Sequence, residues 1–210
     1  MIRAVISDFG GVLTTPLIES FLAYREESGV RFEELGKAMM RIAERDGEHP
    51  LFELEKGRIT EAEFLAAIEA ELGEDVKLGS LRETYFAHLQ PNEPMIRYMR
   101  ELRDRGLRMA LLTNNVREWE PHWRAKLPDI DEIFEVVVDS AFVGMRKPEP
   151  GIYQLTLERL GDGARPEQCV FVDDTEVNCE AAAALGMRAV RFRDADQAMA
   201  ELEGILRGSE

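Results

Sequence analysis

Five apolar runs of strand length, most of them separated by helical patterns, constrain the fold of this chain more than any other feature. The runs lie at residues 2–7, 109–112, 134–138, 170–172 and 187–192. From the second run onward, stretches with apolar residues three and four positions apart lie between them, and a glycine follows each stretch. These stretches cover residues 92–105, 150–160 and 177–185. The pattern predicts an α/β fold with a doubly wound, Rossmann-like parallel sheet.

The segment between the first two runs breaks this alternation. Residues 16–90 show only helical periods, and Thr60 with Glu63 forms a capping-box pattern at the start of one helix. We therefore expect an all-helical cap over residues 16–90. The Rossmann-like core would then consist of residues 1–15 and 91–210.

Size and composition limit the class of protein. The 210 residues suffice for one core domain with a smaller insert, and the formal charge of −15 disfavours binding to nucleic acid. No apolar run approaches the roughly 18 residues that span a bilayer, and the N-terminus has no signal-peptide anatomy, so we expect a cytoplasmic protein that binds no membrane. Cys169 and Cys179 have no metal-ligand or redox spacing, and we expect both thiols to be inert.

Polar residues follow four of the five runs. The segments are Asp8-Phe9-Gly10-Gly11, Thr113-Asn114-Asn115, Arg146-Lys147-Pro148 and Asp173-Asp174-Thr175. Each segment alone is typical of a helix cap, a turn or a surface charge. Because the carboxyl ends of parallel strands meet at one edge of the sheet, the four segments together predict an active site.

The acidic residues of this set predict a metal site. Asp8, Asp173 and Asp174 supply the hard oxygen ligands that Mg²⁺ prefers, and three clustered carboxylates would repel one another without a cation. Asn178, one helical turn beyond Asp174, is placed to support the acidic pair.

The remaining polar residues predict phosphate chemistry. Lys147 can neutralise charge on a phosphoryl group and keep Asp8 ionised. Thr113 and the neighbouring amides, including that of Asn114, can bind phosphoryl oxygens. Phosphoryl transfer needs mainly positioning and charge stabilisation, which this set offers.

The order of these motifs resembles the haloacid dehalogenase superfamily. Within it, the chain resembles the branch related to the phosphatase domain of soluble epoxide hydrolases and to bacterial sugar-phosphate phosphatases. The resemblance rests on Asp-Phe-Gly-Gly-Val-Leu, Leu-Leu-Thr-Asn-Asn, Arg-Lys-Pro-Glu-Pro-Gly-Ile-Tyr and Phe-Val-Asp-Asp-Thr, in that order. It implies an aspartyl-phosphate intermediate on Asp8 and a cap that opens and closes. It also implies magnesium bound by Asp8, Asp174 and the backbone carbonyl of Gly10.

Gly10 departs from the family pattern, in which most phosphatases carry a second Asp as general acid and base. Such a group contributes about 10²–10⁴ in rate, so we expect substrates with good leaving groups, such as anomeric, acyl or aryl phosphates. His122 or His49 could replace the missing group, with surface exposure or packing as the alternative. Trp119 and Trp123 could line the mouth of the site or serve only packing.

Two other functions compete with phosphatase activity. One is cleavage of a carbon–halogen or carbon–phosphorus bond. The dehalogenases compared have an aromatic residue at position 10, and no cap lysine (Lys37, Lys56, Lys77) lies in the apolar setting that a Schiff base requires. The other is a non-catalytic protein that binds phosphate or a partner, although such a protein has no need of a nucleophile. The sequence leaves substrate identity, oligomeric state and the placement of four cap arginines open: Arg25, Arg41, Arg45 and Arg58.

Overall fold

The computed structural model describes residues 1–73, 76–161 and 163–208. Its sheet has five parallel strands: β1 (Ala4–Ser7), β2 (Arg108–Thr113), β3 (Val136–Asp139), β4 (Cys169–Asp173) and β5 (Arg188–Arg191). The strand order is β3-β2-β1-β4-β5, so β1 lies at the centre between β2 and β4. The chain builds the sheet outward on one side of β1 and then crosses to the other side. This doubly wound arrangement confirms the predicted fold class.

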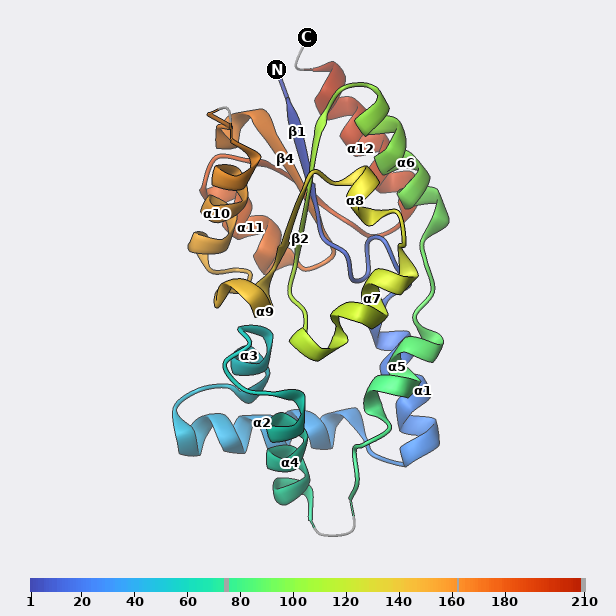
Figure 1. Cartoon of the computed structure of the whole chain (residues 1–210), viewed down its shortest axis with the longest axis vertical. Helices are drawn as coiled ribbons and strands as arrows, with labels where there is room; N and C mark the ends of the chain where they lie inside the picture. The colour runs from blue at the N-terminus through green and yellow to red at the C-terminus, as the bar shows by residue number, and fades with distance from the viewer. Residues whose placement is uncertain (74–75, 162, 209–210) are drawn as a thin grey trace.

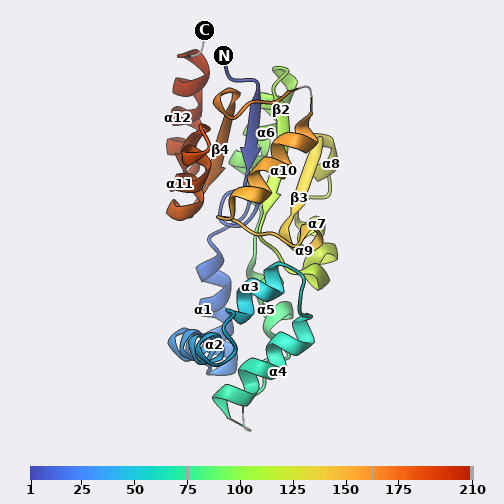
Figure 2. The same ribbon diagram turned by 90° about the vertical axis from the view of Figure 1, so that its left-hand side faces the viewer.

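Helices cover both faces of the sheet. Helices α10 (Pro150–Leu160) and α11 (Glu176–Ala184) pack on one face, against side chains such as Ile6 and Phe171. Helices α6 (Glu93–Asp104) and α12 (Ala195–Arg207) cover the other face, against Val5 and Val172 (Figure 2). Because both faces are buried at the centre of the sheet, β1, β2 and β4 are apolar at most positions, whereas the edge strand β5 has an arginine at each end.

The insert between β1 and β2 contains helices and, among the residues described there, no strand of the sheet. Its helices are α1 (Leu17–Ser28), α2 (Phe32–Asp46), α3 (Pro50–Glu55), α4 (Glu61–Leu72) and α5 (Leu81–His88). They lie beyond the carboxyl ends of the strands, whereas the N-terminus and the last turn of α12 lie at the opposite end (Figure 1). The predicted capping box is present, since Thr60 Oγ1 accepts from the Glu63 amide and the Glu63 carboxylate accepts from the Thr60 amide.

Two antiparallel segments connect the insert to the core. Thr14 pairs with Pro91, and the Thr15 amide donates to the Gln90 carbonyl at 2.8 Å. Asn92, at the N-cap position of α6, makes no side-chain cap. Its side-chain amide instead donates to the Val12 carbonyl at 2.9 Å. Main-chain pairing close to residues 15 and 90, together with this side-chain hydrogen bond, thus joins the insert to the core.

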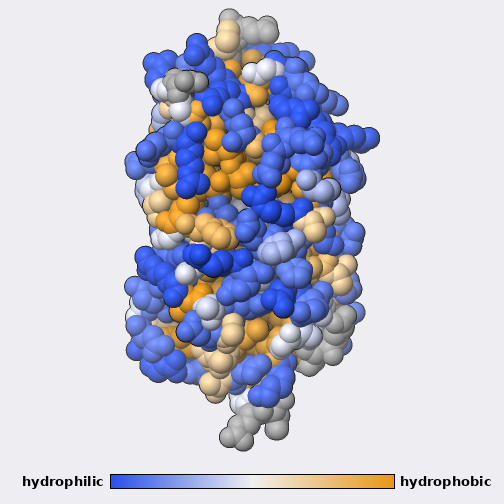
Figure 3. All heavy atoms as spheres, viewed as in Figure 1, coloured by the Kyte–Doolittle hydropathy of each residue, from blue (hydrophilic) through white to orange (hydrophobic). Residues whose placement is uncertain are grey.

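Short helices complete the core. They are the 3₁₀ turns η1 (Arg117–Trp119) and η2 (Pro166–Gln168), and helices α7 (Glu120–Lys126), α8 (Ile130–Ile133) and α9 (Ser140–Val143). On the face seen in Figure 3, hydrophilic residues predominate on both the core and the insert, with apolar patches between them. Across the described part of the chain, each helix is too short or too polar to cross a membrane.

Candidate active site

Three carboxylates meet where β1 and β4 end. Asp8 follows β1 directly, and Asp173 and Asp174 lie at the end of β4. The register pairs Ser7 with Val172, and the Asp8 amide donates to the Val172 carbonyl at 2.8 Å, which continues the pairing beyond the strand. A carboxylate oxygen from each of the three aspartates lies within 4.8 Å of the others. The structure thus brings the predicted acidic residues together.

Lys147 lies between two of these carboxylates. Its ammonium nitrogen is 2.8 Å from Asp8 Oδ1 and 2.6 Å from Asp173 Oδ2, and the side chain is only 1% exposed. Asn114 fixes the lysine backbone, because its Oδ1 accepts from the Lys147 amide at 2.8 Å and its Nδ2 donates to the Lys147 carbonyl at 3.0 Å. The side chain of Asn114 therefore holds the Lys147 backbone in place.

Asp173 is held more completely than the other two aspartates. Asn178 Nδ2 lies 3.1 Å from both of its carboxylate oxygens, and the Thr175 amide donates to Oδ1 at 2.8 Å. Together with Lys147, these donors occupy most of its lone pairs. Asp174 is half-buried, and of these described residues only Thr175 donates a hydrogen bond to its carboxylate. Its Oδ1 accepts from the Thr175 hydroxyl at 3.1 Å. The geometry therefore leaves Asp8 and Asp174 better placed than Asp173 to bind a cation.

The electrostatic balance of the cluster is negative. Burial raises the pKa of Asp8 well above its usual value, and Asp173 raises it further, while Lys147 acts in the opposite direction. Burial and Asp173 likewise raise the pKa of Asp174. For Lys147, burial alone would lower the pKa, but the two carboxylates outweigh it and raise the pKa. Three carboxylates around one ammonium leave negative charge that a divalent cation would balance, and the oxygen donors suit magnesium.

The loop after Asp8 approaches this cluster closely. Gly11 has a φ of 74°, and a Cβ at this position would lie 2.4 Å from Asp174 Oδ2. Only glycine lets the loop adopt this conformation so near the carboxylate. The sequence alone indicated a tight turn here and not this contact. Gly10 and the buried Thr113, at the end of β2, face the same space as neighbours in the wall of a cavity.

Comparison with known families decides the identity of the fold. Residues 2–186 match the haloacid dehalogenase-like hydrolase family. The chain belongs to this family.

Several curated proteins are similar to this chain. Acyl-CoA dehydrogenase family member 10 of Mus musculus is 31% identical over 210 residues, which cover 97% of this chain and 19% of that protein. Bifunctional epoxide hydrolase 2 of Rattus norvegicus is 28% identical over 223 residues and covers 97% of this chain and 39% of that protein. The chain thus spans less than half the length of either relative.

Relatives of similar length include phosphatases. The phosphorylated carbohydrates phosphatase of Thermotoga maritima is 29% identical over 193 residues, with 90% of this chain and 83% of that protein covered. Among solved structures, the HAD family enzyme bt-2542 of Bacteroides thetaiotaomicron has a TM-score of 0.70 and 25% identity, with 91% of this chain and 94% of that chain covered. The chain therefore belongs to a family of hydrolases, and its relatives include a named phosphatase.

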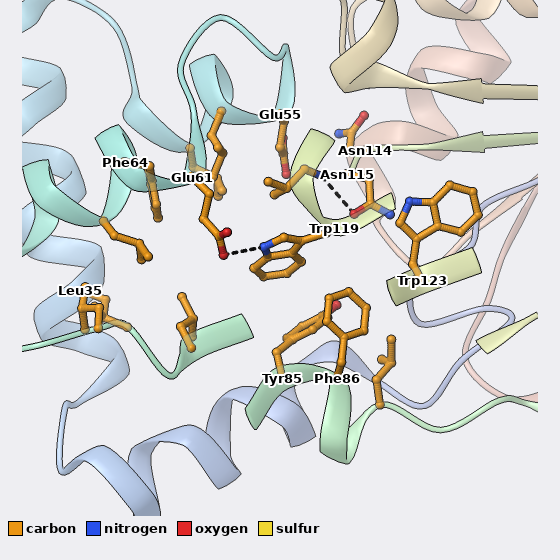
Figure 4. A pocket seen from close by; sticks show the side chains of 18 of the residues that line it. Leu35, Glu55, Glu61, Phe64, Tyr85, Phe86, Asn114, Asn115, Trp119 and Trp123 are labelled. Carbon is orange, nitrogen blue, oxygen red and sulfur yellow. Dashed lines mark hydrogen bonds between the residues drawn. The ribbon is translucent and has the colours of Figure 1, made fainter. Parts of the chain in front are cut away.

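A cavity of about 280 Å³ lies between the core and the insert (Figure 4). We call it the cap pocket. Gly10 and Thr113 line it on the core side, and helices α2 to α5 supply most of the remaining wall. Trp119 and Trp123 both line the pocket, and Trp123 also packs against Phe9 with ring centroids 5.2 Å apart. The two tryptophans therefore serve packing and pocket lining together.

The two histidines considered as proton carriers lie outside the lining of the cap pocket. His122 is exposed and stacks on Phe86 with centroids 5.2 Å apart. His49 stacks on Phe52 at 4.4 Å, and burial together with the charge of Arg146 lowers its pKa. The geometry thus favours the alternative of packing for both histidines.

The four cap arginines are all exposed, and none lines the cap pocket. Arg41 and Arg45 pair with Glu71, and Arg58 pairs with Glu53. Exposed pairs of this kind contribute little to stability. These arginines are therefore not placed to select a substrate in the pocket.

The sequence did not indicate Glu55, and it placed Arg146 in a site segment without assigning it a role. Glu55, at the end of α3, lines the cap pocket, and its carboxylate lies 2.6 Å from Arg146 Nε. Burial raises the pKa of Glu55, and Arg146 partly offsets that effect. The Arg146 guanidinium also lies 3.9 Å from the centroid of the Phe52 ring. Adjacency to Lys147 was the only signal for Arg146, and no pattern distinguished Glu55 from the other glutamates of the insert.

Proposed function

We propose that this chain is a magnesium-dependent phosphohydrolase that acts on a small phosphorylated molecule, with Asp8 as its nucleophile. The observation that carries the proposal is the buried Lys147, which contacts Asp8 and Asp173 at the strand edge where Asp174 also lies. A structural ion pair needs one carboxylate and one cation. The additional carboxylates around Lys147 suit a site in which Asp8 attacks phosphorus. Named phosphatases among the relatives support the same reaction class.

Asp8, Asp174 and the backbone carbonyl of Gly10 would hold the magnesium ion, and Asp173 would act mainly through Lys147 and Asn178. The chemistry that the ion supplies is neutralisation of charge on the phosphoryl oxygens. The negative balance of the cluster supports this assignment, as does the magnesium complex solved for bt-2542, which is 25% identical to this chain with a TM-score of 0.64.

The chain's own residues account for the two chemical steps. A carboxylate oxygen of Asp8 attacks phosphorus, the bond from phosphorus to the ester oxygen breaks, and the leaving group departs with that electron pair. Water then attacks the phosphorus of the aspartyl phosphate, which releases phosphate and restores Asp8. Lys147 and the region around Thr113 stabilise the charge on the transferring group in both steps. Because Gly10 has no side chain, it donates no proton to the leaving oxygen.

We propose that the helical insert acts as the cap of this site, with residues 16–90 as the cap and residues 1–15 and 91–210 as the core. The two connecting segments at Thr15 and Gln90 support these boundaries. The position of the insert beyond the strand ends supports a role in enclosing the substrate (Figure 1).

Turnover of p-nitrophenyl phosphate tests the proposed function. We expect phosphate release with magnesium, loss of release with a chelator, and a fall on the order of 10³-fold or more in Asp8→Asn. Asp129→Asn is the matched control, because Asp129 pairs with Arg100 away from the cluster. Equal turnover in the chelator, or turnover that survives in Asp8→Asn, would contradict the proposal.

A further inference from the structure

The cap pocket opens onto the candidate active site at one end and reaches deep into the insert at the other. Gly10 and Thr113 form its core end, directly beside the strand ends that carry the carboxylates. Leu35 of α2 and Phe64 of α4 lie at the end away from Asn114 and Trp123 (Figure 4). A phosphate at the carboxylate cluster would therefore direct the rest of its molecule into this cavity.

The wall of the cap pocket within the insert is almost wholly apolar. Leucine, methionine, phenylalanine and isoleucine side chains from α2, α3, α4 and α5 form most of it, together with Tyr85 of α5, and Trp119 also lines the pocket. Among the described residues that line the pocket, there is no lysine, arginine or histidine. The wall thus lacks the cationic groups that would bind a second anionic group of a substrate.

The two acidic residues in the wall already have partners. Glu61 accepts from the Trp119 indole nitrogen at 2.7 Å and pairs with Arg82 at 2.8 Å. Glu55 pairs with Arg146 at 2.6 Å. Hydroxyl groups of a carbohydrate would have to displace these contacts or remain without partners, which costs free energy in a buried site. An additional anion in the pocket would be repelled by both carboxylates.

We propose that the cap pocket holds the leaving group of the substrate, and that this group is an uncharged hydrocarbon or aromatic body attached to a single phosphate. This inference rests on the proposed phosphohydrolase function and specifies its substrate class. Of the substrates expected from the sequence, this inference disfavours an anomeric sugar phosphate and retains an aryl phosphate. An apolar phenol needs little proton transfer to depart, which suits a site with glycine at position 10.

A series of 4-alkylphenyl phosphates, from methyl to pentyl, tests the proposal. The alkyl group lengthens the apolar body, while the acidity of the leaving phenol stays nearly constant. The series therefore separates binding of the leaving group from the chemistry of its departure. We expect kcat/KM to rise about fourfold per added methylene until the pocket is filled. The kcat/KM for 4-carboxyphenyl phosphate should be at least tenfold lower than that for 4-methylphenyl phosphate, because its carboxylate would be buried beside Glu55 and Glu61.

A variant of the pocket wall and a matched control locate the effect. Leu35→Gln places an amide at the far end of the pocket, and we expect it to flatten the gain for the longer chains. Met40→Gln makes a similar change on the same helix at a side chain that is 54% exposed and does not line the pocket, and we expect the wild-type dependence on chain length. The 4-alkylphenylphosphonates have a carbon–phosphorus bond and are not hydrolysed. Their inhibition should strengthen with chain length in the same way.

The outcomes separate this inference from the function on which it rests. If 4-methylphenyl phosphate is hydrolysed with dependence on magnesium and Asp8, but chain length has no effect or the carboxylate probe is preferred, the inference is wrong and the phosphatase function stands. An equal loss of the dependence in Leu35→Gln and Met40→Gln would also overturn it. If none of the phosphate esters is hydrolysed, the proposed function fails, and this inference fails with it.

Discussion

Asp139 shows how burial changes the behaviour of a single side chain beside the site. It ends β3 and caps α9, where its Oδ1 accepts from the Ala141 amide at 3.0 Å. Its other oxygen is buried without a hydrogen-bond partner. Burial is the largest influence on this carboxyl and, with the charge of Glu120, raises its pKa to about 7, although the Ala141 amide, Trp123 and Arg124 act in the opposite direction.

The raised pKa of Asp139 predicts a pH-dependent stability. A carboxyl titrates near pH 4 in an unfolded chain, so between about pH 4 and 7 the folded state holds a proton that the unfolded state has released. The free energy of unfolding should therefore fall as pH rises through this window, by up to about 1.4 kcal/mol per pH unit from this group. In Asp139→Asn this contribution should be absent, and the variant should gain stability relative to the wild type between pH 5 and 8. Urea unfolding at several pH values measures the difference.

The carboxylates of the active site also titrate, so the comparison between variant and wild type isolates Asp139. Asp104→Asn is the control, since Asp104 is exposed and pairs with Arg103. A stability difference between Asp139→Asn and wild type that does not change with pH would contradict the account of this residue.

Some residues of the site could be predicted from the sequence and some could not. Asp8 and Asp174 follow apolar runs, and the topology of a parallel sheet brings the residues after such runs together. The side-chain partners of Asn114 and Asn92 were not predictable, because an amide can cap a helix, bind a ligand or hold a neighbouring loop. Sequence spacing indicates which residues are near the edge of the sheet, and the folded loops decide what each residue contacts.

At the scale of elements, α3 connects the insert to the loop before α10. Glu55 of α3 pairs with Arg146, and Lys56, just after α3, pairs with Glu149 at 2.7 Å. The side chains of Glu55 and Arg146 are 16% and 15% exposed, so this pair is largely withdrawn from solvent. Removing one member of such a pair leaves the other buried without a counterion.

Loss of this pair should loosen α3 specifically. In Arg146→Met we expect the free energy of local opening of α3 to fall by on the order of 1–3 kcal/mol, which corresponds to amide exchange about 5- to 150-fold faster. Arg58→Met is the control, because Arg58 is 52% exposed in its pair with Glu53. This substitution should change the free energy of local opening of α3 by about 0.5 kcal/mol or less. Hydrogen exchange of residues 50–55 followed by mass spectrometry gives the comparison. Equal protection of α3 in both variants would show that the Arg146 pair does not hold this helix.

Most elements could be predicted from periodicity because burial imposes it. The predicted helix at 150–160 coincides with α10, and each of the five apolar runs overlaps a strand. The capping box at Thr60 also marks the start of α4 correctly. The short α3 could not be predicted, since six residues are too few to show a helical period. The division of the chain into cap and core stays a prediction, because one apolar cluster continues from the sheet into the insert.

At the scale of the whole molecule, the fold gathers the four motifs at one edge and places an apolar cavity over them. The gathering follows from the parallel direction of the strands, which the alternation of strands and helices indicates. The apolar character of the cavity depends on which faces of α2, α4 and α5 turn towards the core, and the sequence does not specify this. Helical periods reveal that a face is buried, but a face that packs on another helix and a face that lines a pocket have the same pattern.

The central claim is that Asp8 accepts the phosphoryl group, and capture of the modified residue tests it most directly. The protein is mixed briefly with magnesium and an aryl phosphate, quenched in acid, digested and mapped by mass spectrometry. We predict the added mass of one phosphoryl group on the peptide that contains Asp8, and no such mass in Asp8→Asn. Turnover without modification of this peptide, or turnover that persists in Asp8→Asn, would contradict the account.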